Sequence, residues 1–268
     1  MDTNRMITTF SHFGYDMPVK ECYNLIKQTG FDGVTLWWSD DFGNADYRDY
    51  PELARKAGLF IENIHAPFGY INNFWLDDLD GVALTDDLLK LIDDCVVHEF
   101  PTVVLHLTSG DNPPPHNELG LNRIKRLVDK AEKHSINIAF ENLRRTGYLE
   151  YVLSNVDSPY AGFCYDSGHH NCRTPNDDLL SRYGSRLMAL HLHDNDGFIT
   201  GAGEEDQHKL PFDGTINWPK LMNKLSQSGY TGAIAIEASN LGHENLSPEA
   251  FLHLAYERAK KLEGLLCL

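Results

Sequence analysis

Two short apolar runs decide the fold: Asn137-Ile138-Ala139-Phe140-Glu141 and, after a longer polar and amphipathic stretch, Gly162-Phe163-Cys164-Tyr165-Asp166. Each run has the length of a buried strand and ends in a carboxylate. Strands that alternate with helical stretches pair in parallel through right-handed crossovers. The two carboxylates are therefore expected at the same end of one parallel sheet.

The same unit repeats along the chain, with a glycine or a polar turn between a helical stretch and the next short run. The eight predicted strands are Ile7–Phe10, Gly33–Trp37, Phe60–His65, Thr102–Leu107, Asn137–Glu141, Gly162–Asp166, Met188–His193 and Ala233–Glu237. Eight such units in 268 residues fit one closed (β/α)₈ TIM barrel, a single domain over residues 1–268. A doubly wound open sheet is the main competitor, but no GxGxxG turn follows the first strand.

Helix signals lie between the strands. Gly30, Gly58 and Gly229 each follow a helical stretch, where a left-handed residue ends a helix. Ser247-Pro248 has the cap and first-turn proline of a helix start. Helical spacing is visible over Pro18–Thr29, Leu88–Glu99, Asn122–His134 and Pro219–Ser228, and two non-periodic stretches, Phe68–Ala83 and Asn195–Thr215, are expected over the catalytic face.

Composition disfavours several classes of function. The formal net charge of −16 repels the phosphate backbone of nucleic acid. No apolar run is long enough for a membrane span, and no secretory signal is visible at the N-terminus. Five cysteines at irregular spacing favour free thiols and a cytoplasmic location: Cys22, Cys95, Cys164, Cys172 and Cys267.

Acids and histidines gather at the predicted strand ends. In a parallel barrel the carboxyl ends of the strands form the reactive face. Buried carboxylates at this end need a cation or another partner. Oxygen and nitrogen ligands without thiolates suit Zn²⁺, Mn²⁺, Co²⁺ or Mg²⁺, so a divalent metal site is predicted. The six strand-end residues are His65, His106, Glu141, Asp166, His193 and Glu237.

Side chains alternate along a strand, so the residue two positions before each ligand should also point into the barrel. The predicted inward residues are Ala139, Cys164, His191 and Ala235, and the residues expected to face the helices are Phe140, Tyr165, Leu192 and Ile236.

Two loops add candidates to this site. His169 lies three residues after Asp166, where a tight turn could return it to the site. Asp206 and His208 lie in the long loop after the seventh strand. Each could be an exposed loop residue, a further ligand, or a group that orients the ligands.

Other chemistries are disfavoured. No lysine lies at a strand end, which argues against a Schiff-base aldolase. Neither a G-x-S-x-G elbow nor a P-loop is present. Four aromatic residues could form an apolar pocket wall or could equally be ordinary core: Trp37, Trp38, Phe68 and Trp75.

Five segments resemble the xylose-isomerase-like barrel superfamily, in chain order and across nearly the whole chain. They are His65-Ala66-Pro67-Phe68, Phe140-Glu141-Asn142, Tyr165-Asp166-Ser167-Gly168-His169, His191-Leu192-His193-Asp194-Asn195 and Ile236-Glu237. The superfamily includes sugar and sugar-phosphate isomerases and epimerases, related dehydratases, and the endonuclease IV branch of DNA repair, an AP endonuclease family.

The resemblance implies a role for each candidate. Glu141, Asp166, His193 and Glu237 match a tetrad that holds one divalent metal in ketose 3-epimerase-like members, where the two glutamates are also the catalytic acid/base pair. The remaining candidates match residues that bind substrate or further metal ions in different branches: His65, His106, His169, Asp206 and His208. One departure is clear, because Asp194–Gln207 lacks the arginine with which the epimerases bind substrate oxygens.

The resemblance thus implies an enzyme: a metal-dependent isomerase or epimerase of a small keto-sugar, polyol or sugar phosphate. The glutamates would transfer a proton through an enediolate. A dehydratase on the same metal site and an endonuclease IV-like zinc phosphodiesterase are the alternatives, and a non-catalytic sugar- or metal-binding module ranks below both. The expected partner is a small carbohydrate, without nucleic acid or membrane, and a homo-oligomer is left open. One divalent ion or more is expected as cofactor.

Overall fold

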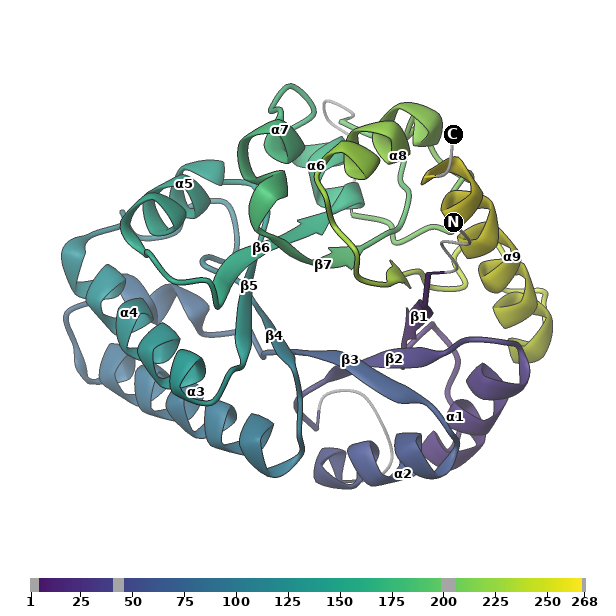
Figure 1. The fold of residues 1–268 in the computed structure, drawn as a ribbon, viewed down its shortest axis with the longest axis horizontal. Coiled ribbons are helices and arrows are strands. Elements are labelled where there is room, and N and C mark those ends of the chain that lie inside the picture. The colour runs from purple at the N-terminus through teal and green to yellow at the C-terminus, as the bar shows by residue number, and fades with distance from the viewer. Residues whose placement is uncertain (1–4, 41–45, 199–205, 267–268) are drawn as a thin grey trace.

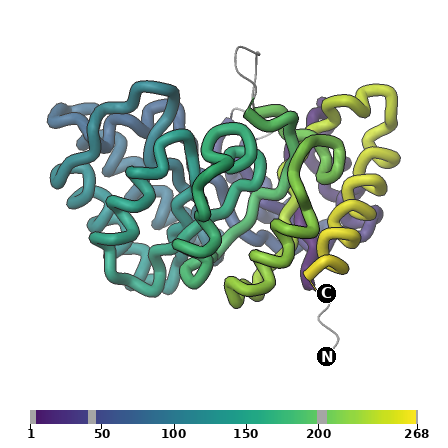
Figure 2. The backbone as a smooth tube through the Cα atoms, turned by 90° about the horizontal axis from the view of Figure 1, so that it is seen from above, coloured from purple at the N-terminus to yellow at the C-terminus, as the bar shows by residue number. Residues whose placement is uncertain are grey.

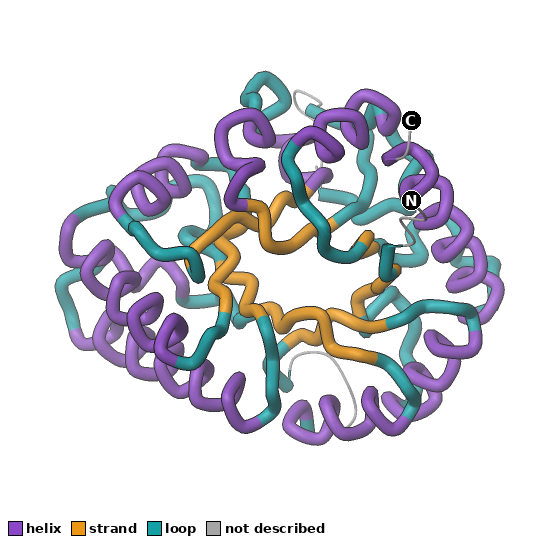
Figure 3. The backbone as a smooth tube through the Cα atoms, viewed as in Figure 1, coloured by secondary structure: helices purple, strands orange, loops and turns teal. Residues whose placement is uncertain are grey.

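The computed structural model describes residues 5–40, 46–198 and 206–266. Eight parallel strands form a ring, and the helices surround it on the outside (Figure 1, Figure 3). The strands are β1 (Ile7–Phe10), β2 (Gly33–Trp37), β3 (Phe60–His65), β4 (Thr102–Leu105), β5 (Asn137–Glu141), β6 (Ala161–Asp166), β7 (Leu187–His191) and β8 (Ile234–Ile236). The predicted (β/α)₈ barrel is confirmed.

The ring closes between its last two strands. The ladder runs β7-β6-β5-β4-β3-β2-β1-β8. Just past β7, Leu192 N donates to Ala235 O at 2.9 Å, and Glu237 N donates to Leu192 O at 3.1 Å. These two bonds bring the ends of β7 and β8 together, so every strand end faces one central space.

Helices follow the strands in the expected alternation. They are α1 (Val19–Gln28), α2 (Tyr50–Lys56), α3 (Leu79–Val97), α4 (Glu118–Lys133), α5 (Thr146–Asn155), α6 (Ser167–Arg173), α7 (Leu179–Tyr183), α8 (Trp218–Gln227) and α9 (Pro248–Leu266), with short 3₁₀ turns η1 (Tyr47–Asp49), η2 (Ile71–Trp75) and η3 (Gly184–Arg186). The C-terminal α9, yellow in Figure 2, packs against β1 and α1 at the start of the chain. The first and last helices, α1 and α9, are therefore neighbours in the outer layer of the barrel.

The predicted helix ends are confirmed. Gly30, Gly58 and Gly229 have φ angles of +109°, +82° and +77°, the left-handed region in which glycine carries no steric penalty. α9 begins at Pro248, and Ala250 N donates to Ser247 Oγ at 3.2 Å.

Several helix and strand boundaries differ from the prediction. α3 begins at Leu79 rather than Leu88, because Asp78 caps it by accepting from Gly81 N at 2.9 Å. η2 and the first turns of α3 therefore occupy much of the stretch predicted as a loop. β4, β7 and β8 also end earlier than predicted, so His106, His193 and Glu237 lie just past their strands.

Apolar packing has two layers. Phe140, Tyr165, Leu192 and Ile236 belong to the main core, shared with the helices, and so does Ala235, which the alternation placed inside the barrel. Ala139 and Cys164 instead form a small separate cluster with Val104 and Ala189. Small side chains inside the barrel leave room for the larger polar residues at its carboxyl end.

Two further observations concern the chain as a whole. None of the described helices combines the length and the apolar character needed to cross a bilayer. Cys22, Cys95, Cys164 and Cys172 are buried free thiols, and Cys267 lies outside the described residues.

Candidate metal and active site

All six strand-end candidates meet at the carboxyl end of the barrel. His65, Glu141 and Asp166 are the last residues of β3, β5 and β6. His106 and Glu237 directly follow β4 and β8, and His193 lies two residues past β7. They are buried, with exposed fractions from 0% to 6%, except for Glu237, whose side chain is 16% exposed. The parallel strands thus concentrate three carboxylates and three imidazoles, largely buried, at one end of the barrel.

The four residues predicted to hold one ion are neighbours. His193 Nε2 lies 3.1 Å from both carboxylate oxygens of Asp166. Ligand atoms of Glu141 and Asp166 come within 4.8 Å of each other, as do those of Asp166 and Glu237 and those of His193 and Glu237. The four side chains therefore form a continuous arc of oxygen and nitrogen donors.

His65 and His106 converge on one atom of this arc. Their Nε2 atoms lie 3.2 and 3.1 Å from the same oxygen, Oε2 of Glu141. Aromatic rings hold both imidazoles: Trp37 stacks on His65 at 4.9 Å, and Phe68 stacks on His106 at 4.3 Å. Two imidazoles and a carboxylate at these distances could bind a second ion or form hydrogen bonds with the hydroxyls of a substrate.

A third group forms around Asp206. Its Oδ2 lies 3.0 Å from His169 Nε2 and 3.4 Å from His208 Nε2. The His208 ring stacks on His193 at 4.0 Å, which joins this group to the arc. The long loop is fixed after this group by paired backbone bonds between Asp194 and Lys209. All nine predicted residues thus lie in one cluster.

His169 reaches the cluster by a helix rather than by the expected tight turn. α6 begins directly after Asp166, whose Oδ1 accepts from His169 N at 2.6 Å as an N-terminal cap. The His169 Nδ1 atom then lies 2.9 Å from Oε1 of Glu141. A carboxylate at the end of β6 therefore both starts the helix and places the histidine.

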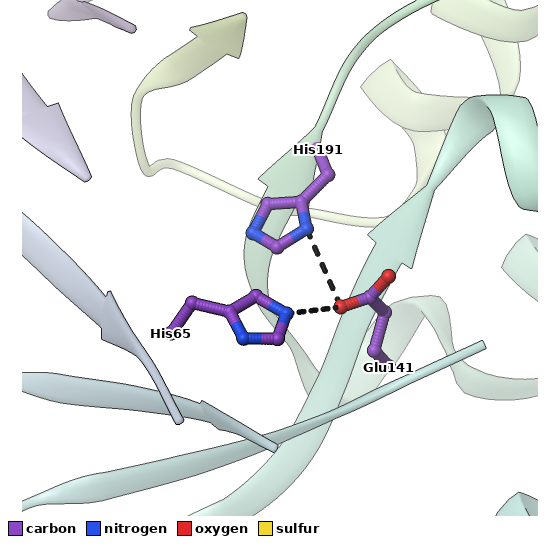
Figure 4. Close-up of side chains that lie close together, drawn as sticks. All are labelled: His65, Glu141 and His191. Carbon is purple, nitrogen blue, oxygen red and sulfur yellow. Dashed lines mark hydrogen bonds and ion pairs between the residues drawn. The ribbon is translucent and has the colours of Figure 1, made fainter. Parts of the chain in front are cut away.

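His191 is the residue to which sequence reasoning gave no role. The alternation placed it inside the barrel, and the register pairs it with Asp166 across β6 and β7. Its Nδ1 atom lies 2.9 Å from Glu237 Oε2 and 3.4 Å from Glu141 Oε2. Figure 4 shows His191 and His65 approaching the same oxygen of Glu141. His191 is thus wedged between the two predicted catalytic glutamates.

The site offers nitrogen and oxygen atoms that suit a divalent cation. Several buried atoms have no hydrogen-bond partner of suitable geometry among the described residues: His191 Nδ1 and Nε2, His193 Nδ1, Asp206 Oδ1 and Glu237 Oε2. Buried polar atoms without partners are rare, because each one costs desolvation free energy. A divalent ion among these nitrogen and oxygen atoms would offset that cost.

The electrostatics agree with this fit. Burial pushes the pKa of Glu141 upward, but His106 and His191 outweigh it and hold that pKa well below its ordinary value. For Asp166 burial is likewise outweighed by His169 and His193, which lower its pKa to about 2. Burial lowers the pKa of His169, whereas Asp166 and Asp206 raise it well above normal. The carboxylates are therefore ionised and need positive charge, which histidines or a metal ion can supply.

A cavity of about 660 Å³ opens above the cluster. Trp37 and Phe68 form part of its wall, whereas Trp38 and Trp75 are each 3% exposed and pack in the core. Of the two alternatives left open for these aromatic residues, the pocket wall therefore applies to Trp37 and Phe68, and core packing applies to Trp38 and Trp75. Sequence reasoning also missed two groups of wall residues, one at the end of β1 and one in the loop after β8: Phe10, His12, Ala238, Ser239, Asn240, Leu241 and Glu244. Their position directly after strands was the signal that could have found them.

Comparison with known sequences supports the same fold. A family model described as "Xylose isomerase-like TIM barrel" matches residues 23–256. The chain is 26% identical over 293 residues to the uncharacterized protein y4fM of Sinorhizobium fredii, covering 94% of this chain and 90% of that protein. It is 22% identical to fructoselysine 3-epimerase of Escherichia coli O157:H7, covering 92% and 94%. Inosose isomerase of Halalkalibacterium halodurans matches at 23% over about half of each chain.

Solved structures agree in fold. D-psicose 3-epimerase of Clostridium cellulolyticum H10, solved with D-tagatose, superimposes with a TM-score of 0.75 at 16% identity, over 97% of this chain and 99% of that one. A D-tagatose 3-epimerase-like protein gives 0.71 at 19% identity, over 98% of both chains.

Proposed function

The chain belongs to the xylose isomerase-like TIM barrel family, and from this membership we propose that it is a metal-dependent isomerase or epimerase of a small keto-sugar, polyol or sugar phosphate. Relatives named as sugar isomerases and epimerases support this reaction class. One observation carries the proposal: Glu141, at the end of β5, and Glu237, directly after β8, line the same cavity.

The two glutamates are the proposed proton carriers. A carboxylate can remove the proton from the carbon next to a carbonyl, and a second carboxyl can return a proton to the same carbon or its neighbour. Since Glu141 and Glu237 extend from different strands, they can reach a bound sugar from different sides. His191 contacts both, so it fixes their orientation within the barrel.

Glu141, Asp166, His193 and Glu237 are the proposed ligands of the central ion. When bound there, a divalent cation would polarise the substrate carbonyl and stabilise the negative charge that develops on its oxygen. His169, with one nitrogen facing Glu141 and the other facing Asp206, would orient substrate hydroxyls. Trp37 and Phe68 would exclude water from the apolar side of the sugar.

The proposal is tested by measuring whether a hydrogen bound to a carbon of the substrate exchanges with solvent. The protein, as purified, is incubated in D₂O with a panel of ketoses, and the recovered sugars are analysed by NMR and mass spectrometry. Deuterium next to the carbonyl, absent with Glu141→Gln, supports the proposal. Lack of exchange across the panel would contradict it. Loss of water from a sugar in the same assay would instead identify a dehydratase on the same site.

A phosphodiesterase is a second candidate, because the nine residues that resemble a multi-zinc site lie in one cluster. Within it, His65 and His106 face Glu141 Oε2, and His169 and His208 face Asp206 Oδ2. The net charge of −16 opposes a nucleic-acid substrate. Nicking of an abasic-site duplex at low salt, abolished by Glu237→Gln, would favour this candidate over the sugar reaction.

A further inference from the structure

A smaller cavity of about 190 Å³ adjoins the main one. Phe68, His106, His169 and Asp206 line both cavities, so the two spaces meet at the metal-ligand cluster. The remaining wall of the smaller cavity, which we call the arginine cavity, consists of Thr108, Ser109, Gly110, Leu143, Arg144 and Arg173.

Arg173 contributes a largely buried guanidinium. It lies four residues after His169 on α6, so both side chains are on the same face of that helix. Its side chain is 13% exposed, and Nη2 lies 3.0 Å from Asp206 Oδ2. The buried Nε atom has no hydrogen-bond partner among the residues that the structure describes. Part of its donor capacity is therefore unused.

Arg144 contributes the second guanidinium. It follows Glu141 by three residues in the loop after β5. Its Nη1 atom pairs with Asp111, whose side chain is 70% exposed. Such a surface pair contributes little stability, so Arg144 can exchange this partner for a ligand at small cost.

Thr108 and Ser109 form another part of the wall, and side-chain hydrogen bonds fix the backbone there. Asn72 fixes the backbone of Ser109 on both sides, with Asn72 Nδ2 donating to Ser109 O at 2.8 Å and Ser109 N donating to Asn72 Oδ1 at 2.9 Å. Thr108 is 3% exposed and, with Ser109, brings a hydroxyl to the cavity.

Arginines outnumber carboxylates in the described wall of the arginine cavity. Two arginines line a cavity in a chain of net charge −16. The only carboxylate in that wall, among the described residues, is Asp206, whose Oδ2 already faces His169, His208 and Arg173. A neutral sugar has no group that needs two guanidinium ions, whereas phosphate and carboxylate match their planar donor geometry.

We propose that the arginine cavity binds an anionic substituent of the substrate, a phosphate or a carboxylate, through Arg144 and Arg173. The inference rests on the proposed function and narrows its substrate class to acidic keto-sugars. The segment Asp194–Gln207 after β7 lacks the arginine with which the epimerases bind substrate oxygens. Arg144, after β5, and Arg173, on the helix after β6, would take its place.

Two measurements test it. Isothermal titration calorimetry with inorganic phosphate and with acetate compares the protein as purified with Arg144→Gln and Arg173→Gln. The matched control is Arg126→Gln, which removes the same charge from an exposed side chain 3.9 Å from Asp86. Separately, kcat/KM is measured for ketoses, their terminal phosphate esters and their terminal carboxylates.

We expect the phosphate or the carboxylate series to exceed the neutral ketoses in kcat/KM at least tenfold, and Arg144→Gln to reduce that preference roughly tenfold, as loss of a charged hydrogen bond does. The favoured series identifies the anion. Inorganic anion affinity should fall in both arginine variants and not in Arg126→Gln.

The failures are distinguishable. If ketoses are turned over with no preference for charged members, and Arg144→Gln binds phosphate and acetate as the wild type does, the arginine cavity is not an anion site although the proposed function stands. If anion binding falls in the variants but no sugar reacts, the anion site stands and the sugar reaction is wrong.

Discussion

Gly168 lies directly against the imidazole of His193, and a Cβ at position 168 would overlap the Cε1 and Nδ1 atoms of that ring. His193 is one of the four proposed ligands of the central ion. The position therefore needs glycine because a ligand ring occupies the space of its side chain.

Gly168→Ala should displace His193 and thereby lower metal content and activity, with a loss of about 1–3 kcal/mol in the free energy of unfolding from overpacking. Metal per chain by mass spectrometry, circular dichroism and urea unfolding check this. Gly264→Ala is the control, since a Cβ there meets no atom within 4 Å. Full metal content in Gly168→Ala would show that His193 is not a ligand.

Glu141→Gln and Glu237→Gln should each lower kcat by about 10²–10⁴-fold, because an amide cannot accept the substrate proton. The fold, followed by circular dichroism, should be unchanged. Glu150→Gln is a matched control, as that side chain is 59% exposed in a surface pair with Arg182. Full turnover by Glu141→Gln would refute its role as a proton carrier.

Dialysis against a chelator should abolish turnover, and readdition of a divalent ion should restore it. Asp206→Asn should lower the metal stoichiometry by about one ion per chain, because its carboxylate lies beside two imidazoles and an amide is a poorer ligand. An unchanged stoichiometry with a raised KM would instead assign Asp206 and its histidines to substrate binding.

Glu62→Gln should change how stability depends on pH. Burial raises the pKa of Glu62 to about 7, although the Thr8 hydroxyl and His191 act in the opposite direction. Because this folded-state value exceeds the ordinary 4.5, the native state binds the proton more tightly than the unfolded chain between these values. The contribution of Glu62 to the free energy of unfolding therefore decreases as pH rises from about 4.5 to 7.

Glutamine keeps an oxygen that can accept from Thr8 and removes the titration. Relative to the wild type, Glu62→Gln should gain about 1–3 kcal/mol by pH 8, a range discounted for the partial exposure of the residue. Urea unfolding at pH 4.5, 6 and 8 measures the difference. A constant difference across these pH values would contradict the assignment.

The sequence predicted the ring of strand ends because strand length and alternation are local properties. His65, Glu141 and Asp166 end their strands as predicted. The start of α3 could not be read in this way, since Leu79 is 84% exposed and interrupts the apolar periodicity of the helix.

The roles of residues that depend on strand register or on the path of a loop could not be predicted from the sequence. His191 was predicted to point inward, but its contacts with two glutamates arise from the register between β6 and β7. Trp38 and Trp37 are adjacent in the chain, and only the path after β2 decides that one packs in the core and the other lines the pocket. Arg173 needed the helix that follows Asp166 to come within reach of Asp206.

The first two strands of the barrel differ from the other six in what they bring to the site. Each of β3 to β8 brings a candidate ligand, whereas β1 and β2 bring Phe10 and Trp37 to the cavity wall. Substitutions in the first strands can thus reshape the wall without removing a ligand. If the proposed function holds, changes in the first two strand units could alter which substrates the cavity accepts while every proposed ligand is retained.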